Sequence, residues 1–200
     1  MRLTKQAQKD LILGNVVTAA TMLQDSRDFS LLMPEVRVNL VYALPDARTG
    51  KDVAAIDGRM TVVNGLPHAS GLPAWGGSDH MARLIIQVRR HDPAINAGIN
   101  FKCDADVIEV VKQYCQEKGF RFGFIDRSKE PSEVAGPDRS SMPWKIDYMV
   151  QTYGGMPKLF YENEGWGKEP LFVVLGADAV EVTRITLEIA RRYRKKVKRN

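Results

Sequence analysis

Apolar residues recur with two different periods along the chain, and their order predicts a protein that mixes helices and strands. Apolar positions three or four residues apart indicate amphipathic helices, whereas alternation or short continuous apolar runs indicate strands. The helical pattern covers residues 4–26, 78–92, 104–119, 144–152 and a last segment from 178 into the basic C-terminus. The strand pattern covers residues 36–42, 58–63, 97–102, 120–125, 158–161 and 171–175. Because these elements are interleaved, we expect one sheet covered by helices on both faces. Short spacings between some strands suggest hairpins and therefore a mixed sheet.

Short polar residues and glycines mark the expected helix ends. Ser78, Asp104 and Asp178 precede apolar periodic segments and are good N-caps. Gly119 follows a helical pattern and is a good C-cap. We expect loops over residues 45–53, 68–77 and 126–143. The last loop is long for a compact domain, and such loops are more often functional than filler. We expect its residues 128–141 to close over a bound substrate.

Composition is ordinary for a globular protein, with 44% hydrophobic and 26% charged residues among 200. A chain of this length buries roughly 70% of its unfolded surface. We therefore expect a single domain over residues 1–200, with two small domains as the alternative. Cys103 and Cys115 have no CxxC partner or paired histidines nearby, so we expect free thiols.

Targeting signals are not evident in the sequence. The first 13 residues carry Lys5, Lys9 and Asp10 and lack the apolar stretch of a signal peptide. No segment reaches the roughly 20 apolar residues that span a bilayer. We expect a soluble, cytoplasmic protein that does not enter the membrane.

The net charge is +5, and much of the excess is at the C-terminus. The basic residues there are Arg191, Arg192, Arg194, Lys195, Lys196, Lys198 and Arg199. Such a run could contact nucleic acid or acidic lipid. The simpler interpretation is a helix end whose cations complement the helix dipole. Because no recognition-helix or zinc pattern accompanies the run, we expect no nucleic-acid partner.

The segment from Gly76 to His80 is the first candidate site. Two glycines precede a helix that Ser78 can cap, so backbone N–H groups and the helix dipole could hold an anion such as phosphate. A plain loop-to-helix turn is an equally good interpretation of this segment alone. His80 in the first turn could donate to a ligand phosphate, although a lone histidine is usually structural.

Two further segments carry charged residues at strand ends. Arg59 follows Gly58 at a strand start, where its guanidinium could bind a phosphate with two nitrogens. A surface ion pair with Asp52 or Asp57 is the alternative. The segments 126–130 and 163–170 adjoin strands, where α/β folds often carry sites, but a solvated turn explains each equally well.

Motifs of other enzyme classes are not found. The sequence contains no Walker A motif, no GxGxxG after the first strand and no GxSxG. His68, His80 and His91 lack the spacing of a zinc site.

Five segments, in order along the chain, resemble one known family. They are VRVNLVYALP at 36–45, DVAAIDGRM at 52–60, GSDHMAR at 77–83, DRS at 126–128 and GKEP at 167–170. Together they resemble the archaeal-type thiamine-phosphate synthase domain, the ThiN family, from about Asn15 to about Ala190. In many relatives this domain is fused to a kinase or follows a DNA-binding domain. Since the stretch before Asn15 is too short for either, we expect a stand-alone copy.

The resemblance implies a fold, a reaction and a set of site residues. The fold is a three-layer α/β/α arrangement with a mixed, largely antiparallel central sheet, as in class II aldolase-like proteins. The reaction joins hydroxymethylpyrimidine diphosphate to a hydroxyethylthiazole phosphate and yields thiamine phosphate and pyrophosphate. Arg59 and His80 match the family's essential arginine and histidine. The implied substrate- or phosphate-binding residues are Gly76, Gly77, Ser78, Arg83, Asn100, Arg127, Ser128 and Lys168. We expect Mg²⁺ as a cofactor that binds the diphosphate, with one or two carboxylates such as Asp126 or Glu169 as its ligands.

Two other functions remain as alternatives. The chain could be a module that senses thiamine phosphate without catalysis, although the presence of Arg59 and His80 favours an enzyme. It could also be a nucleic-acid-associated protein that uses the basic C-terminus. Since relatives are commonly dimeric, we expect a homodimer.

Overall fold

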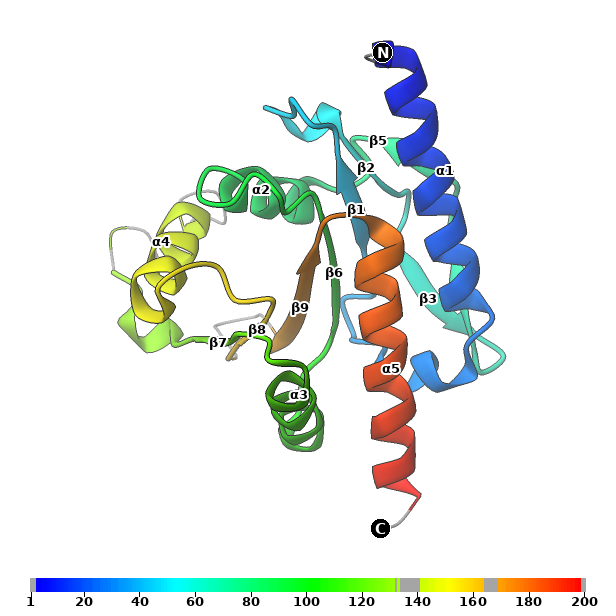
Figure 1. The fold of residues 1–200 in the computed structure, drawn as a ribbon. Coiled ribbons are helices and arrows are strands. Elements are labelled where there is room, and N and C mark those ends of the chain that lie inside the picture. The colour runs from blue at the N-terminus through cyan, green and yellow to red at the C-terminus, as the bar shows by residue number, and fades with distance from the viewer. Residues whose placement is uncertain (1–2, 132, 134–140, 164–168, 199–200) are drawn as a thin grey trace.

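The computed structural model describes residues 3–131, 133, 141–163 and 169–198, which form alternating helices and strands (Figure 1). The helices are α1 (Lys5–Gln24), α2 (Asp79–Val88), α3 (Ala105–Lys118), α4 (Ser141–Tyr153) and α5 (Ala179–Val197). The strands are β1 (Leu40–Ala43), β2 (Val53–Ile56), β3 (Met60–Val63), β4 (Leu66–Ala69), β5 (Pro73–Trp75), β6 (Ala97–Lys102), β7 (Phe122–Ile125), β8 (Leu159–Glu162) and β9 (Leu171–Gly176). Short 3₁₀ helices cover Arg27–Leu32, Gly50–Asp52 and Arg127–Lys129.

The main sheet has seven strands in the order β5-β2-β1-β6-β9-β8-β7. Strands β7 and β8 pair in parallel, and the other neighbours in this sheet pair antiparallel. Strands β3 and β4 form a separate hairpin. The expected mixed, largely antiparallel sheet is therefore confirmed.

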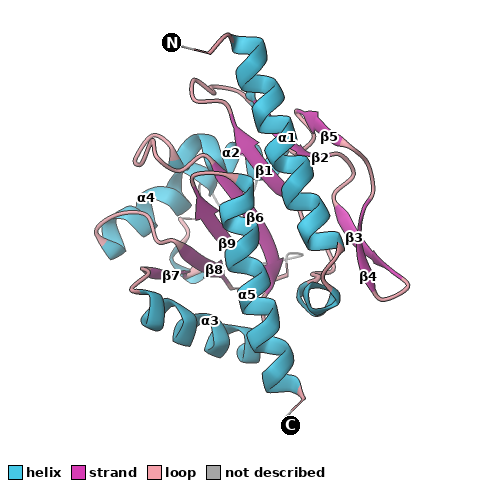
Figure 2. Ribbon diagram, turned by 45° about the vertical axis from the view of Figure 1, so that its right-hand side comes forward, coloured by secondary structure: helices cyan, strands magenta, loops and turns pink. Residues whose placement is uncertain are grey.

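Helices cover both faces of the main sheet, which gives three layers (Figures 1 and 2). Because side chains alternate along a strand, each strand contributes to two separate cores. On β1, Leu40 joins the core under α1, α3 and α5, whereas Val41 and Ala43 join the core under α2 and α4. The three-layer arrangement is confirmed, and α2 lies on the face opposite α1 and α5.

Several predicted strands begin later than expected, and for two of them the reason is a residue with a left-handed backbone. The strand expected at 36–42 starts at Leu40, because the backbone of Arg37 adopts a φ of 69°. The strand expected at 58–63 starts at Met60, because Gly58 and Arg59 have φ values of 68° and 67°. Such left-handed residues cannot continue an extended strand.

Three short strands were not predicted. Strand β5 lies within the loop expected at residues 68–77 and β4 overlaps the start of that loop, so the loop prediction was wrong there, whereas β2 begins at the last residue of the loop expected at 45–53. Strand β2 contains two alanines, which have little intrinsic preference for strands. Strands β4 and β5 contain prolines, which occur in strands chiefly at edges. Both strands are indeed at edges, since β5 is the edge of the main sheet and β4 lies in a two-stranded hairpin.

Helix caps follow the sequence with one exception. Asp104 and Asp178 accept hydrogen bonds from the backbone of Val107 and Glu181, and Gly119 ends α3 with a φ of 65°. Ser78 occupies the N-cap position of α2, but its side chain makes no capping hydrogen bond. The Ser78 hydroxyl is thus not engaged by the helix that it precedes.

Basic residues at the C-terminus of α5 form ion pairs with neighbouring helices. Arg192 pairs with Glu117 on α3, and Arg194 pairs with Asp28. Lys196 contacts Asp106 and Glu109. These contacts give the basic segment a structural role in joining α5 to its neighbours.

Both cysteines are free and buried, and burial raises the pKa of each thiol to about 12. Among the described residues, no helix combines the length and apolar character needed to cross a bilayer.

Candidate active site

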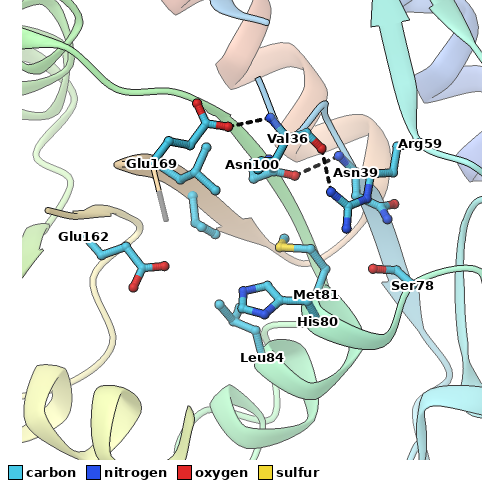
Figure 3. Close-up of a pocket in the computed structure, with 12 residues that line it drawn as sticks. Val36, Asn39, Arg59, Ser78, His80, Met81, Leu84, Asn100, Glu162 and Glu169 are labelled. Carbon is cyan, nitrogen blue, oxygen red and sulfur yellow. Dashed lines mark hydrogen bonds between the residues drawn. The ribbon is translucent and has the colours of Figure 1, made fainter. Parts of the chain in front are cut away.

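A cavity of about 200 Å³ opens between the N-terminus of α2 and the strands of the main sheet (Figure 3). Its walls combine apolar side chains with polar and charged groups. The lining residues are Val36, Asn39, Arg59, Ser78, His80, Met81, Leu84, Asn100, Glu162, Glu169, Leu171 and Val173. Five of the residues predicted from the sequence as site residues therefore line this cavity: Arg59, Ser78, His80, Asn100 and Glu169.

Three of these five residues hold one backbone segment, residues 35–39, which we call the brace segment. The Glu169 carboxylate accepts hydrogen bonds from the N–H groups of residues 35 and 36. The Arg59 guanidinium donates to the carbonyl of Val36. The Asn100 amide accepts from the N–H of residue 39 at 2.7 Å and donates to the carbonyl of residue 37 at 3.1 Å. The brace segment thus forms one wall of the cavity and is fixed by side chains from three separate parts of the chain.

Arg59 is positioned by an unusual backbone conformation. It follows Gly58 in the turn between β2 and β3, and both residues lie in the left-handed region. A left-handed arginine is uncommon, and such conformations concentrate at functional sites. The hydrogen bond to Val36 occupies Nη1, so the rest of the planar guanidinium is available to face an anion.

Helix α2 positions Ser78 and His80 at the cavity. Ser78 is 8% exposed and directly precedes α2, and the half-buried His80 is its second residue. Backbone N–H groups of a first helical turn have no partner within the helix and favour anions. The sticks of Figure 3 show the imidazole at the cavity below Arg59 and Asn100. A phosphate in this cavity would therefore face both a helix start and a guanidinium.

Gly76 and Gly77 precede this helix but do not line the cavity. Gly76 has a φ of 79°, and its N–H bonds to the carbonyl of Val53. A Cβ at Gly77 would lie 3.2 Å from the carbonyl oxygen of Ala55 and 3.4 Å from that of Ala74. The two glycines let the chain turn and pack closely against β2 and β5, which sets the position of α2.

Replacing Gly77 with alanine is expected to lower the free energy of unfolding by about 1–3 kcal/mol, the usual cost of overpacking. Gly14 provides a matched control, since it lies in α1 with no atom within 4 Å of a Cβ. Gly14→Ala should raise the free energy of unfolding by about 0.5–1 kcal/mol. Urea unfolding followed by circular dichroism measures both changes. A stabilised Gly77→Ala protein would contradict the packing role.

A buried group of charges lies behind one wall of the cavity. Glu162 lines the cavity from the end of β8 and pairs with Lys145 of α4, which is 4% exposed. Arg127 pairs with Glu130 at 3.0 Å and lies 3.8 Å from Glu162. Arg127 therefore does not line the cavity but contacts a carboxylate that does.

The expected metal ligand Asp126 and the expected ligand-binding Ser128 lie together in one turn. The hydroxyl and N–H of Ser128 donate to Asp126 and hold the pKa of its carboxyl below the usual value. Neither residue lines the cavity. Within the part of the chain that the structure describes, no group of three or more His, Cys, Asp or Glu side chains is arranged to hold a metal ion.

The last two candidate residues predicted from the sequence are Arg83 and Lys168. Arg83 lies one turn into α2, pairs with Asp79 at 3.0 Å and does not line the cavity. Lys168 lies outside the described residues.

Several residues that line the cavity were not predicted from the sequence. Met81 and Leu84 were recognised only as the inward face of a helix, and Val173 only as part of a strand. Asn39 was an available signal, because it is a polar residue directly before the apolar run at 40–44. Glu162 gave no such signal, since its position depends on how β8 pairs with β9.

Comparisons with known proteins agree with each other over nearly the whole chain. The family model described as "Thiamine-phosphate synthase ThiN" matches residues 15–188. A curated protein of that name from Methanothermobacter thermautotrophicus is 36% identical over 180 residues, which cover 90% of this chain and 93% of the relative. The bifunctional thiamine biosynthesis protein ThiDN from Methanocaldococcus jannaschii is 34% identical over 178 residues, which cover 88% of this chain and 40% of that protein.

Solved structures show the same fold. The C-terminal domain of phosphomethylpyrimidine kinase superposes with a TM-score of 0.86 at 32% identity, covering 91% of this chain and 99% of that chain. YgbL from Escherichia coli, described as an aldolase, epimerase or decarboxylase, gives a TM-score of 0.52 at 14% identity, covering 92% of this chain and 88% of that one. The second likeness concerns the fold alone and confirms the aldolase-like architecture.

Proposed function

The chain belongs to the thiamine-phosphate synthase ThiN family, a family of transferases in thiamine biosynthesis, and from this premise we propose its reaction and the roles of its residues. It joins hydroxymethylpyrimidine diphosphate to hydroxyethylthiazole phosphate. The products are thiamine phosphate and pyrophosphate. The observation that carries the proposal is the cavity itself, which brings Arg59 and His80 together from different elements beside a helix N-terminus.

The chemistry needs charge stabilisation more than acid or base strength. The bond between the pyrimidine methylene carbon and the diphosphate oxygen breaks, and its electron pair leaves with pyrophosphate. The thiazole nitrogen donates the electron pair of the new carbon–nitrogen bond and becomes positively charged. Arg59 holds the diphosphate, and His80 donates a hydrogen bond to the oxygen that leaves. Donors fixed where charge develops are among the largest sources of enzymatic rate.

The apolar part of the cavity suits an aromatic ring. Met81 and Leu84 of α2 line it together with Leu171 and Val173 of β9. A cavity of about 150 Å³ holds one benzene ring, so the observed volume of about 200 Å³ accommodates one heteroaromatic ring. We assign this space to the pyrimidine, with its diphosphate directed toward Arg59 and the start of α2.

Mg²⁺ belongs to the proposal as a partner of the diphosphate. The ion commonly uses one or two carboxylates together with substrate phosphates, and it would supply positive charge for the departing pyrophosphate. Glu169 is well placed to be a Mg²⁺ ligand, because it lines the cavity. Its carboxylate also accepts hydrogen bonds from two backbone N–H groups. Asp126 fits less well, since it does not line the cavity and caps a turn.

We also propose a cytoplasmic protein, in keeping with its two free cysteines. The homodimer, the single-domain organisation and the closing of residues 128–141 stay predictions. Most of that last segment lies outside the described residues.

One assay tests the proposed function against the sensing alternative. The purified protein is incubated with both precursors and Mg²⁺, and thiamine phosphate is measured by its fluorescent thiochrome derivative. We expect product and pyrophosphate in equal amounts, and none when either precursor is omitted. A protein that binds thiamine phosphate tightly but forms none from the precursors would be a sensor.

A further inference from the structure

Glu162 presents a carboxylate to the cavity from the side opposite Arg59. It is the last residue of β8 and lines the cavity, and Figure 3 shows its carboxylate directed away from the strand toward the side on which His80 lies. The side chain of Glu162 is 18% exposed, so a ligand in the cavity can reach it. The cavity therefore has a negative group at one end and a guanidinium at the other.

Two cations behind the cavity wall hold this carboxylate. The Lys145 Nζ donates to Oε2 of Glu162, and Nη1 of Arg127 lies 3.8 Å from the same oxygen. The side chains of Lys145 and Arg127 are only 6% and 11% exposed. Within the residues that the structure describes, no group donates to the other oxygen, Oε1. Oε1 is thus the oxygen that Glu162 can offer to a ligand.

Stability alone does not explain why these charges are buried. Replacing a buried ion pair by apolar residues of similar volume is often neutral or stabilising. Arg127 does not require Glu162 as a partner, because it already pairs at 3.0 Å with Glu130, whose side chain is 3% exposed. A lysine buried directly behind a glutamate that lines a cavity is better explained as a support that fixes the direction of that glutamate.

Resting on the proposed function, we propose that Glu162 recognises the 4-amino group of the pyrimidine diphosphate. An acceptor oxygen requires a donor, and the thiazole ring of the second substrate has no N–H group. The pyrimidine carries an exocyclic amino group, and its diphosphate is assigned to the end of the cavity at Arg59. A molecule with an N–H donor at one end and an anion at the other matches the two charged ends of the cavity. A carboxylate is also a stronger acceptor than a neutral oxygen.

Two unreactive analogues measure this recognition without turnover. In both, a methylene group replaces the oxygen that joins the pyrimidine methylene carbon to the diphosphate. One analogue keeps the 4-amino group and the other carries a methyl group there, so they differ in the donor and hardly in size. Isothermal titration calorimetry in the presence of Mg²⁺ gives the ratio of the two dissociation constants. The wild-type protein should prefer the amino analogue by about 10- to 100-fold, the scale of a hydrogen bond to a charged group.

Glu162→Gln should bring this ratio to within about 3-fold of unity, because the charged acceptor is lost. The Lys145 Nζ needs an acceptor, so the amide oxygen of the glutamine turns toward it and the amide NH₂ group faces the cavity. A donor then meets the donor of the substrate. If this protein shows no cooperative thermal transition, Lys145→Met combined with Glu162→Leu replaces it, since an apolar pair leaves neither charge buried alone. The double variant should also give a ratio near unity.

Glu130→Gln is the matched control for the charge. It removes one negative charge from the same group of side chains, but Glu130 does not line the cavity and pairs with Arg127. Its ratio should stay within about 3-fold of the wild-type value, because the acceptor at the cavity is unchanged. If Glu130→Gln loses the preference as fully as Glu162→Gln, the charge of the whole group sets the preference and the contact from Glu162 does not.

The remaining outcomes separate this inference from the proposed function. A wild-type ratio in either Glu162 variant, or a wild-type protein that does not distinguish the analogues, overturns the role of Glu162 while thiamine phosphate synthesis stands. Weaker binding of both analogues at an unchanged ratio also overturns it and assigns Glu162 to the metal or to the fold. A protein that forms no thiamine phosphate and binds neither analogue overturns the proposed function and this inference together.

Discussion

Arg59→Ala is expected to lower kcat for thiamine phosphate formation by at least about 100-fold, the scale of losing one group that stabilises developing charge. The guanidinium is fixed by a left-handed backbone and by its hydrogen bond to Val36, so it is oriented before substrate binds. Pre-oriented donors lose little energy to reorganisation during the reaction. Arg59→Lys keeps the charge without the planar pair of donors, and its kcat should lie between those of Arg59→Ala and wild type. Steady-state kinetics with both precursors measures these values.

Arg37 is a matched control for Arg59, because it is an arginine with the same left-handed backbone and belongs to the brace segment. It is exposed, it has a φ of 69° against 67° for Arg59, and its side chain does not line the cavity. Arg37→Ala should therefore keep kcat within about 3-fold of wild type, because it changes only an exposed side chain that does not line the cavity and leaves the backbone of the brace segment in place. Arg59→Ala also removes the hydrogen bond to Val36, which costs about 1 kcal/mol of stability. If both alanine variants lose activity equally, Arg59 supports the brace segment and does not contact the diphosphate.

The order of elements could be predicted from the sequence because it depends on local patterns. Residues 97–102 form a strand within the predicted bounds, since the segment is apolar and lies between clear turns. Asp104 and Gly119 define α3 through cap chemistry that is local to the chain. Strands β2, β4 and β5 were not predicted, because their short segments contain alanine or proline and become strands only by pairing within their sheets.

The candidate site was only partly predictable, because its geometry depends on contacts that are distant in sequence. The resemblance to a family identified Arg59 and His80, and the structure places both at one cavity. The pattern of two glycines before a capped helix suggested Gly76 and Gly77, which the structure places in the turn before α2 and outside the cavity lining. Asn39 lies at the cavity only because Asn100, from β6, holds its backbone. No local pattern encodes that contact.

His80→Ala is expected to lower kcat by at least about 100-fold with little change in the KM for the thiazole phosphate. The imidazole lies in the first turn of α2 at the cavity, where it can contact the leaving oxygen. A hydrogen bond that forms fully only as charge develops affects kcat rather than substrate affinity. His68, which is exposed on β4 and does not line the cavity, is the histidine control. His68→Ala should retain near wild-type kcat.

The acidity of the leaving group distinguishes donation by His80 from a general structural role. Pyrimidine substrates can carry a diphosphonate leaving group with either a methylene or a difluoromethylene bridge. The fluorinated group leaves more easily because fluorine withdraws charge from its oxygens, so it depends less on a hydrogen-bond donor. If His80 donates to that oxygen, His80→Ala should lose much more activity with the methylene substrate than with the fluorinated one. An equal loss with both substrates would show that His80 orders the start of α2 and leaves the departing oxygen to other donors, such as the N–H groups of the first helical turn.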